Sequence, residues 1–510
     1  MTIQAVNRAG PLAGSLAIII IGVLVAAATV LALTLFRPVL FVLALGGLVL
    51  LILALVIPDR KAYWMFLLVL SMLFDVGKRL TTWIVEPWEV MQVSGPPSSG
   101  TFSLDLFSTD IILFAMLLPW LIRLSLRQER LYFPKVGYVF LLYLAWALIA
   151  SLINAQSFYL SIFEWCRQAA YFLYFVCIVN NVSTRSQLRA AILALLIGLV
   201  IEAGTVIAFF QAEIGTETSA FSGLYRETEH QVAATTHYES ESGEEKHTKR
   251  SAGTFVHPSQ AAYYFEFTMA IALACLIAAR GATLRLLFGA IYAGGLLAIY
   301  LTFSRSGLVG LIFGIIVFFA VARRAGLVSR QLFARCLVIF ITCLTLSAPV
   351  LINSLLSRPQ AATYRLELLA DSLETYRQHP LAGSGLAAVV IDARKKVDNK
   401  VRFRAIHNQY LVLLTEVGPL GLLLFYAFFW QVAKTAFRRM RAAKAEMKLL
   451  LVGAVAAFAS IAMHNLGDGF GGHANAAMLW LYAGLIVAVA RQVQGERALS
   501  APVLATAVAR

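Results

Sequence analysis

Long apolar runs recur along the whole chain and dominate its pattern of hydrophobic and polar positions. Each run is about 20 residues long, which is the length that a helix needs to cross the hydrocarbon core of a bilayer. We therefore predict an all-α polytopic membrane protein with about fourteen transmembrane helices. The expected spans are residues 14–35, 39–57, 62–78, 104–122, 136–153, 161–179, 188–211, 259–279, 284–303, 306–322, 335–352, 408–432, 448–464 and 474–490.

The composition supports one membrane domain over residues 1–510. Hydrophobic residues make up 60% of the chain and charged residues 14%, an apolar fraction above the usual range for soluble domains. The first apolar run is long for the core of a signal peptide and many spans follow it, so we expect a retained helix. The five cysteines lie in or beside apolar runs without metal-ligand spacing, which favours inert thiols over a disulfide framework.

Basic residues lie mainly in short segments beside the expected spans and give the chain a net charge of +15. In a soluble protein this charge would favour nucleic-acid binding, but retention of positive residues in the cytoplasm explains most of it here. We expect no nucleic-acid partner, and we place both termini in the cytoplasm. The orienting clusters are Arg60 and Lys61; Arg123, Arg127, Arg130 and Lys135; Arg185 and Arg189; Arg280 and Arg285; Arg323, Arg324, Arg330 and Arg335; and Lys434, Arg438, Arg439, Arg441, Lys444 and Lys448.

Three long loops fall on the outer face in this topology. Residues 79–103 contain three prolines and are expected to be irregular. The polar loop 212–258 is rich in Glu and His but lacks fixed ligand spacing, so we interpret it as a disordered, solvated loop rather than a metal site. The large loop 353–406 holds nine basic and five acidic residues, against the charge rule. Either anionic outer-leaflet lipid or a phosphorylated ligand explains this charge, and clustered arginines favour the ligand.

Residues 364–378 within the large loop are predicted to form an amphipathic helix. The residues that fall on one face at helical spacing are Leu366, Leu369, Ala370, Leu373 and Tyr376. Such a helix can lie flat on the membrane surface, and we expect it to do so.

His407 is the first candidate for chemistry, because it stands where this basic loop meets the apolar run 408–432. The positive dipole end of a helix disfavours the imidazolium, which would keep the ring neutral and ready to accept a proton. The alternative is a solvated interfacial histidine without a catalytic role.

Three charged side chains in or beside the expected spans are further candidates. Arg305 lies in the tight turn between spans 284–303 and 306–322, where it either snorkels to water or binds an anion. Arg167 has the same choice, but Glu164 is one helical turn away and could pair with it. Glu416 falls inside span 408–432, where it either orients a site group or makes a structural hydrogen bond.

Four motifs in a fixed order resemble the O-antigen ligase and Wzy polymerase superfamily, and together they cover residues 250–430. They are His407-Asn408-Gln409-Tyr410-Leu411 with Glu416, Gly418, Gly421 and Phe425; Ser304-Arg305; Tyr364-Arg365 with Pro380-Leu381-Ala382-Gly383-Ser384-Gly385; and Gly253-Thr254-Phe255-Val256-His257-Pro258. The resemblance implies a GT-C type fold and a metal-independent, inverting glycosyltransferase of the bacterial inner membrane that needs no cofactor and has its active site on the periplasmic face. The lack of an Asp-x-Asp pair on the outer loops agrees with metal independence.

The resemblance also implies roles for individual residues. His407 would be the base that deprotonates the acceptor hydroxyl of the sugar. A leaving pyrophosphate needs cations, and arginines would supply them in place of a metal. The residues expected to bind the donor pyrophosphate are Arg305, Arg365, Arg167 and Arg404, and the supporting residues are Glu416, Asn408, Tyr410 and His257.

The donor implied by the resemblance is a glycan linked to undecaprenyl pyrophosphate. A polymerase passes it to a second lipid-linked repeat of O-antigen or exopolysaccharide, and a ligase passes it to lipid A–core. Ligases of this superfamily have about twelve spans, so the larger expected number favours a polymerase, with a chain-length regulator as a further partner. The rival from another class is a flippase or ion-coupled transporter, which would place ionisable groups near the midplane of the bilayer.

Overall fold

The computed structural model describes most of the expected spans and parts of the loops. Two compact units divide the chain, Met1–Tyr63 and Trp64–Arg510, and the fold below is that of the second unit. The described residues are 56–73, 77–82, 103–155, 158–212, 235–239, 245–255, 257–331, 333–335, 338, 369–370, 372–388, 396–397, 400–401, 407–469 and 472–500.

Within these residues, 10 helices are long and apolar enough to cross a membrane, which confirms an all-α polytopic membrane protein. They are α5 (Ser108–Ser125), α6 (Lys135–Asn154), α7 (Phe158–Asn181), α8 (Arg185–Ala212), α10 (Pro258–Ala278), α11 (Ala282–Leu301), α12 (Arg305–Arg324), α16 (Gln409–Met440), α17 (Ala445–His464) and α18 (His473–Ser500). Each lies at an expected span.

The four remaining expected spans keep the count of fourteen a prediction. Expected spans 14–35, 39–57 and 335–352 lie wholly or largely outside the described residues. At 62–78 the structure has α3 (Arg60–Ser71), a helix of 12 residues, too short by itself to cross a bilayer.

Short antiparallel hairpins interrupt the loops between the helices. Strand β1 (Gly77–Thr82) pairs with β2 (Ser103–Phe107), β3 (Thr235–Glu239) with β4 (Glu245–Lys249), and β5 (Lys396–Val397) with β6 (Lys400–Val401). The expectations of an irregular segment at 79–103 and a disordered one at 212–258 were therefore wrong at these strands. In the first loop the prolines lie between the paired strands, so they mark the connection and leave the strands free to pair.

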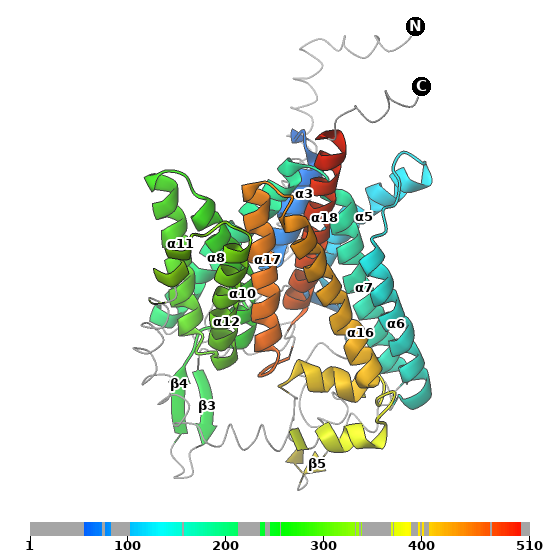
Figure 1. The fold of residues 1–510 in the computed structure, drawn as a ribbon. Coiled ribbons are helices and arrows are strands. Elements are labelled where there is room, and N and C mark those ends of the chain that lie inside the picture. Colours follow the sequence, from blue (N-terminus) through cyan, green and yellow to red (C-terminus); the bar gives the residue numbers. More distant parts are fainter. Residues whose placement is uncertain are drawn as a thin grey trace, which may run out of the picture. The chain divides into compact units, whose positions relative to one another are not determined.

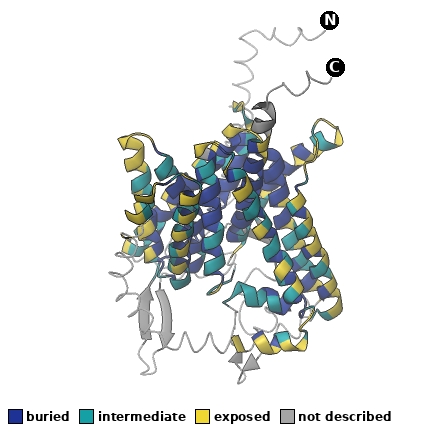
Figure 2. Ribbon diagram, viewed as in Figure 1, coloured by how far each residue is buried: buried dark blue, intermediate teal, exposed yellow. Residues whose placement is uncertain are grey.

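Helices α10, α17 and α18 form the most enclosed part of the bundle, as the burial colours show (Figure 2). Two glycines one turn apart, Gly310 and Gly314 of α12, face Ser460 of α17, so the two backbones approach closely. Small residues at such spacing let membrane helices pack without the hydrophobic driving force that water supplies. Large aromatic side chains fill the space between α6, α7, α16 and α18, among them Phe140, Phe172, Phe175, Phe428 and Trp480.

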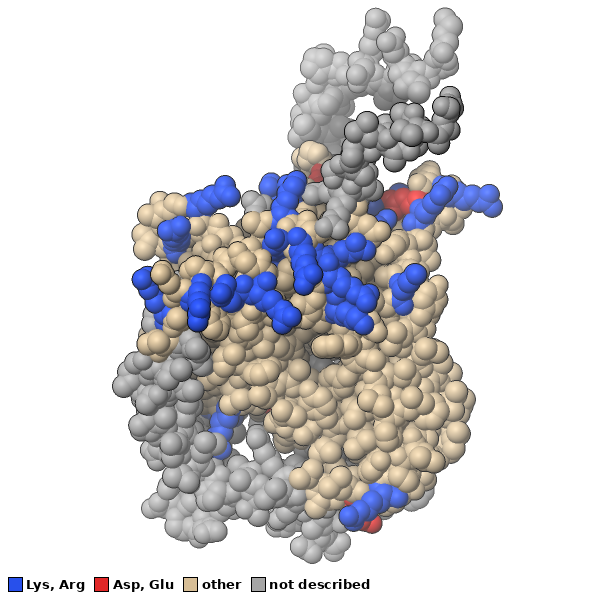
Figure 3. All heavy atoms as spheres, in the orientation of Figure 1, with Lys and Arg blue, Asp and Glu red and all other residues tan. Residues whose placement is uncertain are grey.

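The helices have two chemically different ends. Lysines and arginines gather in a band at one end, here called the basic end (Figure 3). The opposite end, here called the histidine end, carries the histidines at the starts of α10, α16 and α18 and at the end of α17. Successive helices alternate in direction, so the histidine end collects the starts of some helices and the ends of others. Polar residues from distant parts of the sequence therefore lie at the same end.

Helix α16 is broken near its start. Gly418 has φ 69 and ψ −178 and precedes Pro419, so the first turns of the helix run across the bundle instead of along it (Figure 1). A side chain at Gly418 would overlap the backbone of Leu381. The indole of Trp146 donates a hydrogen bond to the carbonyl of Val417 (2.8 Å), a group next to the break.

The segment after the predicted amphipathic helix docks against this break. Ser384 and Gly385 donate backbone hydrogen bonds to the carbonyls of Thr415 (2.8 Å) and Glu416 (2.9 Å). Nδ2 of Asn154, at the end of α6, donates a hydrogen bond to the carbonyl of Gly383 (2.9 Å). The loop therefore closes over the first half of α16 and fixes its direction.

The amphipathic helix predicted at 364–378 is present where the structure describes it, at residues 369–370 and 372–378. Ser372 and Thr375 are buried against the protein, while Leu369 and Leu373 are each 37% exposed. An apolar face that stays partly exposed fits a position of this helix on the membrane surface, which stays a prediction.

Candidate active site

The histidine end contains a close pair of side chains from two different segments, His407 and Asp468. Nδ1 of His407 lies 3.0 Å from Oδ1 of Asp468, and the His407 side chain is 39% exposed. His407 precedes α16, and Asp468 lies between α17 and α18. The imidazole is thus held by a carboxylate on one side and reaches solvent on the other.

Backbone contacts fix the start of α16 against the loop that carries Asp468. The N–H of Gln409 donates to the carbonyls of Asn465 (3.0 Å) and Asp468 (3.2 Å). Asn408 caps the helix through its Oδ1, which accepts from the N–H groups of Tyr410 (3.0 Å) and Leu411 (3.1 Å). Its Nδ2 donates to the carbonyl of Leu466 (3.1 Å). The His407–Asp468 pair is therefore held in place by hydrogen bonds between the two segments that carry it.

Tyr410 completes this support. Its hydroxyl donates to the carbonyl of Ala462 near the end of α17 (2.8 Å), and its ring stacks on Tyr426, which lies after the break in α16. Both Asn408 and Tyr410 therefore position the loop and helix ends on either side of the pair, as supporting residues would.

Charge and hydrogen bonding decide which ring nitrogen can react. Burial would raise the pKa of Asp468, but the hydrogen bond and charge of His407, the charge of His464 and the N–H of Gly469 together hold this pKa well below its usual range. An ionised Asp468 can only accept, so Nδ1 of His407 carries the proton on that side. Nε2 is then the nitrogen that can take a proton from a substrate hydroxyl.

His257 lies within electrostatic range of the same pair. Desolvation of the ring by the surrounding protein lowers the pKa of His257 from 6.5 to about 4, and the charges of Arg250 and His407 act in the same direction. The charge of Asp468 opposes them, and one side of the residue stays exposed. Its Nδ1 lies 2.8 Å from Oγ of Ser259 and accepts from the Ser259 N–H at 3.3 Å, so His257 also caps α10.

A buried carboxylate anchors the segment before His257. Glu202 of α8, which is fully buried, accepts from Oγ1 of Thr254 at 2.7 Å and from its N–H at 3.2 Å. Gly253 adopts φ 60 there, where a side chain would collide with Glu202. This explains why the Gly253–Pro258 motif begins with glycine: the turn must pass closely over a buried acid.

The Ser304-Arg305 turn reaches the same region. Ser304 caps α12 by accepting from the N–H of Gly307 (3.3 Å), and Arg305 is the first residue of that helix. The next residue, Ser306, lies directly against Gly467, one residue before Asp468. The structure therefore brings the start of α12 to the loop that holds His407, as the predicted site requires.

Arg250 is a cation near His257 that was not predicted from the sequence. Its Nε donates to the carbonyl of Thr302 in the α11–α12 turn (2.9 Å), and its charge acts on His257. It lies at the edge of the polar loop 212–258, where a basic residue among many charged ones gives no signal of its own.

The partnership of Asp468 with His407 was not predicted from the sequence. The two residues are 61 positions apart, and no local pattern connects them.

Arg167 and Glu416 lie in a second polar group. Arg167 pairs with Glu164 one turn earlier on α7, the structural alternative that the spacing had allowed. Glu416, which is 6% exposed, is within electrostatic range of Arg167. Two remaining predicted cations, Arg365 and Arg404, lie outside the described residues, so their roles stay predictions.

The second polar group continues towards His473 at the start of α18. Tyr171, one turn after Arg167 on α7, lies 3.1 Å from Nδ1 of His473 through its hydroxyl. Nε2 of His473 lies 3.4 Å from Asp110 on α5, and its ring stacks on Phe107. This network ties α5, α7 and α18 together at the histidine end.

The fold and this site define a class: a polytopic membrane protein whose helix ends build an oriented histidine and several cations at one membrane surface. Residues 289–426 match the family model described as O-antigen ligase. This match confirms the resemblance to the O-antigen ligase and polymerase superfamily. It indicates a membrane enzyme of polysaccharide biosynthesis, of glycosyltransferase-like type, that meets lipid-linked glycan in a bacterial membrane. A comparison with curated proteins found no match.

Proposed function

We propose that this protein transfers a glycan from an undecaprenyl-pyrophosphate donor to an acceptor sugar, most simply to a second lipid-linked repeat in polymerisation. The observation that carries the proposal is the His407–Asp468 pair at the histidine end, 3.0 Å apart and open to solvent at the imidazole. A histidine that acts as a general base needs one ring nitrogen held in orientation and the other accessible to substrate, and His407 meets both conditions.

The reaction follows from the charges that the site offers. The acceptor hydroxyl attacks the anomeric carbon, its proton passes to Nε2 of His407, and the bond from that carbon to the pyrophosphate oxygen breaks with its electron pair. Asp468 stabilises the imidazolium that forms. Direct attack from the side opposite the leaving group inverts the anomeric centre, and the cations carry the charge without a metal.

Arg305 supports the leaving-group half of the proposal, because its helix starts beside the loop that holds Asp468. Arg365, Arg167 and Arg404 are proposed as further pyrophosphate contacts. Since an arginine fork binds two phosphate oxygens at once, a few such residues can hold a pyrophosphate in one orientation.

A ligase that transfers the glycan to lipid A–core is the second candidate, favoured by the description of the matching family. We place the histidine end on the periplasmic face of the inner membrane and both termini in the cytoplasm, since the basic end fits the cytoplasmic side. A chain-length regulator is a proposed partner of the polymerase.

The test is the product formed by the purified full-length protein. With lipid-linked repeats alone, a polymerase gives a ladder of longer chains, while a ligase gives no product until lipid A–core is added. Movement of the lipid-linked glycan across vesicles without any transfer would instead support a transporter and overturn the proposal.

A further inference from the structure

The basic end contains a cavity far from the proposed active site. It has a volume of about 340 Å³ and lies between the start of α8, the end of α10 and the start of α17. Its floor is apolar, built from Leu188, Ile192, Met447, Leu449 and Leu450.

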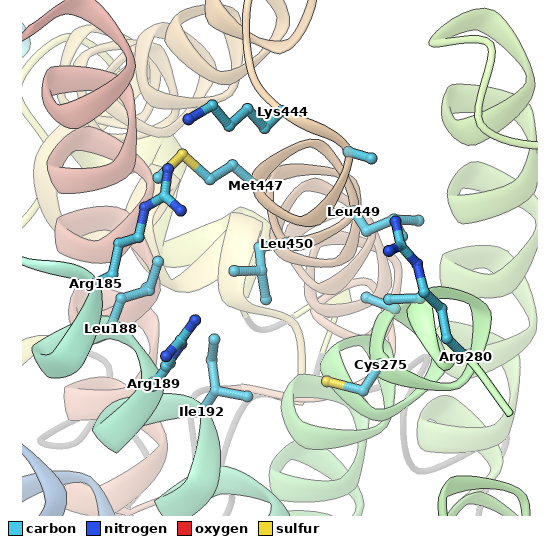
Figure 4. Close-up of a pocket in the computed structure, with 13 residues that line it drawn as sticks. Arg185, Leu188, Arg189, Ile192, Cys275, Arg280, Lys444, Met447, Leu449 and Leu450 are labelled. Carbon is cyan, nitrogen blue, oxygen red and sulfur yellow. The ribbon is translucent and has the colours of Figure 1, made fainter. Parts of the chain in front are cut away.

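Four cations from three separate segments line this cavity. Arg185 and Arg189 come from the first turns of α8, Arg280 follows α10, and Lys444 precedes α17. In Figure 4 Arg185 and Arg189 of α8 lie on the opposite side of the cavity from Arg280. Lys444 lies at the top of the view, next to Met447. All four residues are exposed, and the described lining includes no carboxylate.

Helix direction adds to the positive charge. Arg185 is the first residue of α8, and Ala445, the first residue of α17, also lines the cavity. The N-terminus of α17 has no side-chain cap. Two helix N-termini therefore direct their positive dipole ends towards a space that four cations already surround.

Retention of positive charge on one side of the membrane accounts for basic residues at helix ends, but not for their convergence on a cavity with an apolar floor. A free phosphate would need only the cations. A phospholipid needs both parts, because its head group carries the anion and its acyl chains need apolar surface.

We propose that this cavity is a binding site for an anionic phospholipid, with the phosphate on Arg189 and Arg280 and an acyl chain on the apolar floor. The lipid would link α8, α10 and α17 at the basic end. The site is independent of the proposed glycan transfer, since none of its residues takes part in that reaction.

Native mass spectrometry of the full-length protein tests the site. The protein is reconstituted with a neutral phospholipid or with a mixture containing phosphatidylglycerol, then released into mild detergent, and the lipid retained is measured. The variant Arg189→Gln/Arg280→Gln should retain phosphatidylglycerol at least about tenfold less well, given the attraction of each basic residue to anionic lipid. The matched control Arg323→Gln/Arg324→Gln removes two exposed cations from the basic end of α12, outside the cavity, and should retain it like the wild type.

Three outcomes would overturn the proposal. Equal retention in both double variants would show that the cavity cations do not select the lipid. Equal retention of the neutral phospholipid would show that the anion is irrelevant, and full displacement by millimolar inorganic phosphate would show a simple anion site. Should the double variant not fold, Arg280→Gln alone decides the matter, with about threefold weaker retention expected.

Discussion

For individual residues, the main finding is that the pairing with Asp468 fixes the orientation of the His407 imidazole. The carboxylate orients Nδ1, and the backbone of Gln409 ties the two segments together. The hydrogen bond and charge of His407 help to hold the pKa of Asp468 well below its usual range, so Asp468 is an ionised acceptor for Nδ1. The orientation of His407 thus depends on Asp468, which lies in the segment between α17 and α18.

Replacing Asp468 by Asn should lower kcat for glycan transfer about 100-fold or more, with a much smaller change in KM, because the amide cannot stabilise an imidazolium. Rates measured with the purified variant check this. The control Glu374→Gln neutralises an exposed carboxylate at the histidine end that pairs with Arg377, and it should leave kcat unchanged. A wild-type kcat in Asp468→Asn would contradict the assigned role.

His257 makes the stability of the fold depend on pH. Its folded pKa of about 4 lies below the unfolded value of 6.5, so the unfolded chain binds more protons between these values. Stability is therefore lost as the pH falls through that window. The unfolding midpoint of the wild type should fall further between pH 7.5 and pH 5 than that of His257→Asn, which keeps a capping residue. Equal falls in both proteins would count against a neutral His257 in the folded state.

At the scale of elements, the break in α16 is what turns the start of this helix towards the loop carrying Asp468. The break needs the left-handed backbone of Gly418, and the docked loop at Leu381 leaves no room for a side chain. A straight helix would carry Asn408 and His407 along the bundle axis, away from that loop.

Substituting Gly418→Ala should destabilise the protein by about 2 kcal/mol or more, from the strained backbone and the collision with Leu381, and should reduce transfer as well. Thermal unfolding in detergent measures the first effect. The control Gly204→Ala on α8, where nothing lies near the added methyl group, should be neutral or slightly stabilising. If both variants unfolded together with the wild type, the break would not be a fixed feature.

Features that a short stretch of sequence encodes could be predicted, whereas contacts that depend on the packing of distant helices could not. Ten spans could be predicted because the length of an apolar run shows directly whether a helix can cross the membrane, and the Ser304-Arg305 turn lies between two such runs. The hairpin β1–β2 was missed because its strands lie at the two ends of a long loop and overlap the expected spans 62–78 and 104–122. The partnership of Asp468 with His407 and the contact of Ser306 with Gly467 depend on helix packing, which no single segment encodes.

At the scale of the whole molecule, the two ends of the membrane helices divide the chemistry. The histidine end gathers the proposed catalytic groups, and the basic end gathers the charges and the proposed lipid site (Figure 3). Because successive helices alternate in direction, each end collects residues from the full length of the described chain.

Labelling of single cysteines tests this orientation, in a protein whose five native cysteines are replaced. Ser183→Cys, at the basic end between α7 and α8, should react with a membrane-impermeant maleimide only after the inner membrane is opened. Gln378→Cys, on the exposed side of the helix 372–378, should react in intact spheroplasts. The reverse pattern would place the histidine end in the cytoplasm and remove the lipid-linked donor from its reach.

The most direct test of the central claim is the transfer activity of purified His407→Ala given lipid-linked donor and acceptor. Loss of at least about 100-fold in kcat is expected, because the variant lacks the base assigned to take the proton from the acceptor hydroxyl. His379→Ala, which removes a histidine from the docked loop of the same end, should retain activity. Full activity in His407→Ala would contradict the assignment of His407 as the catalytic base.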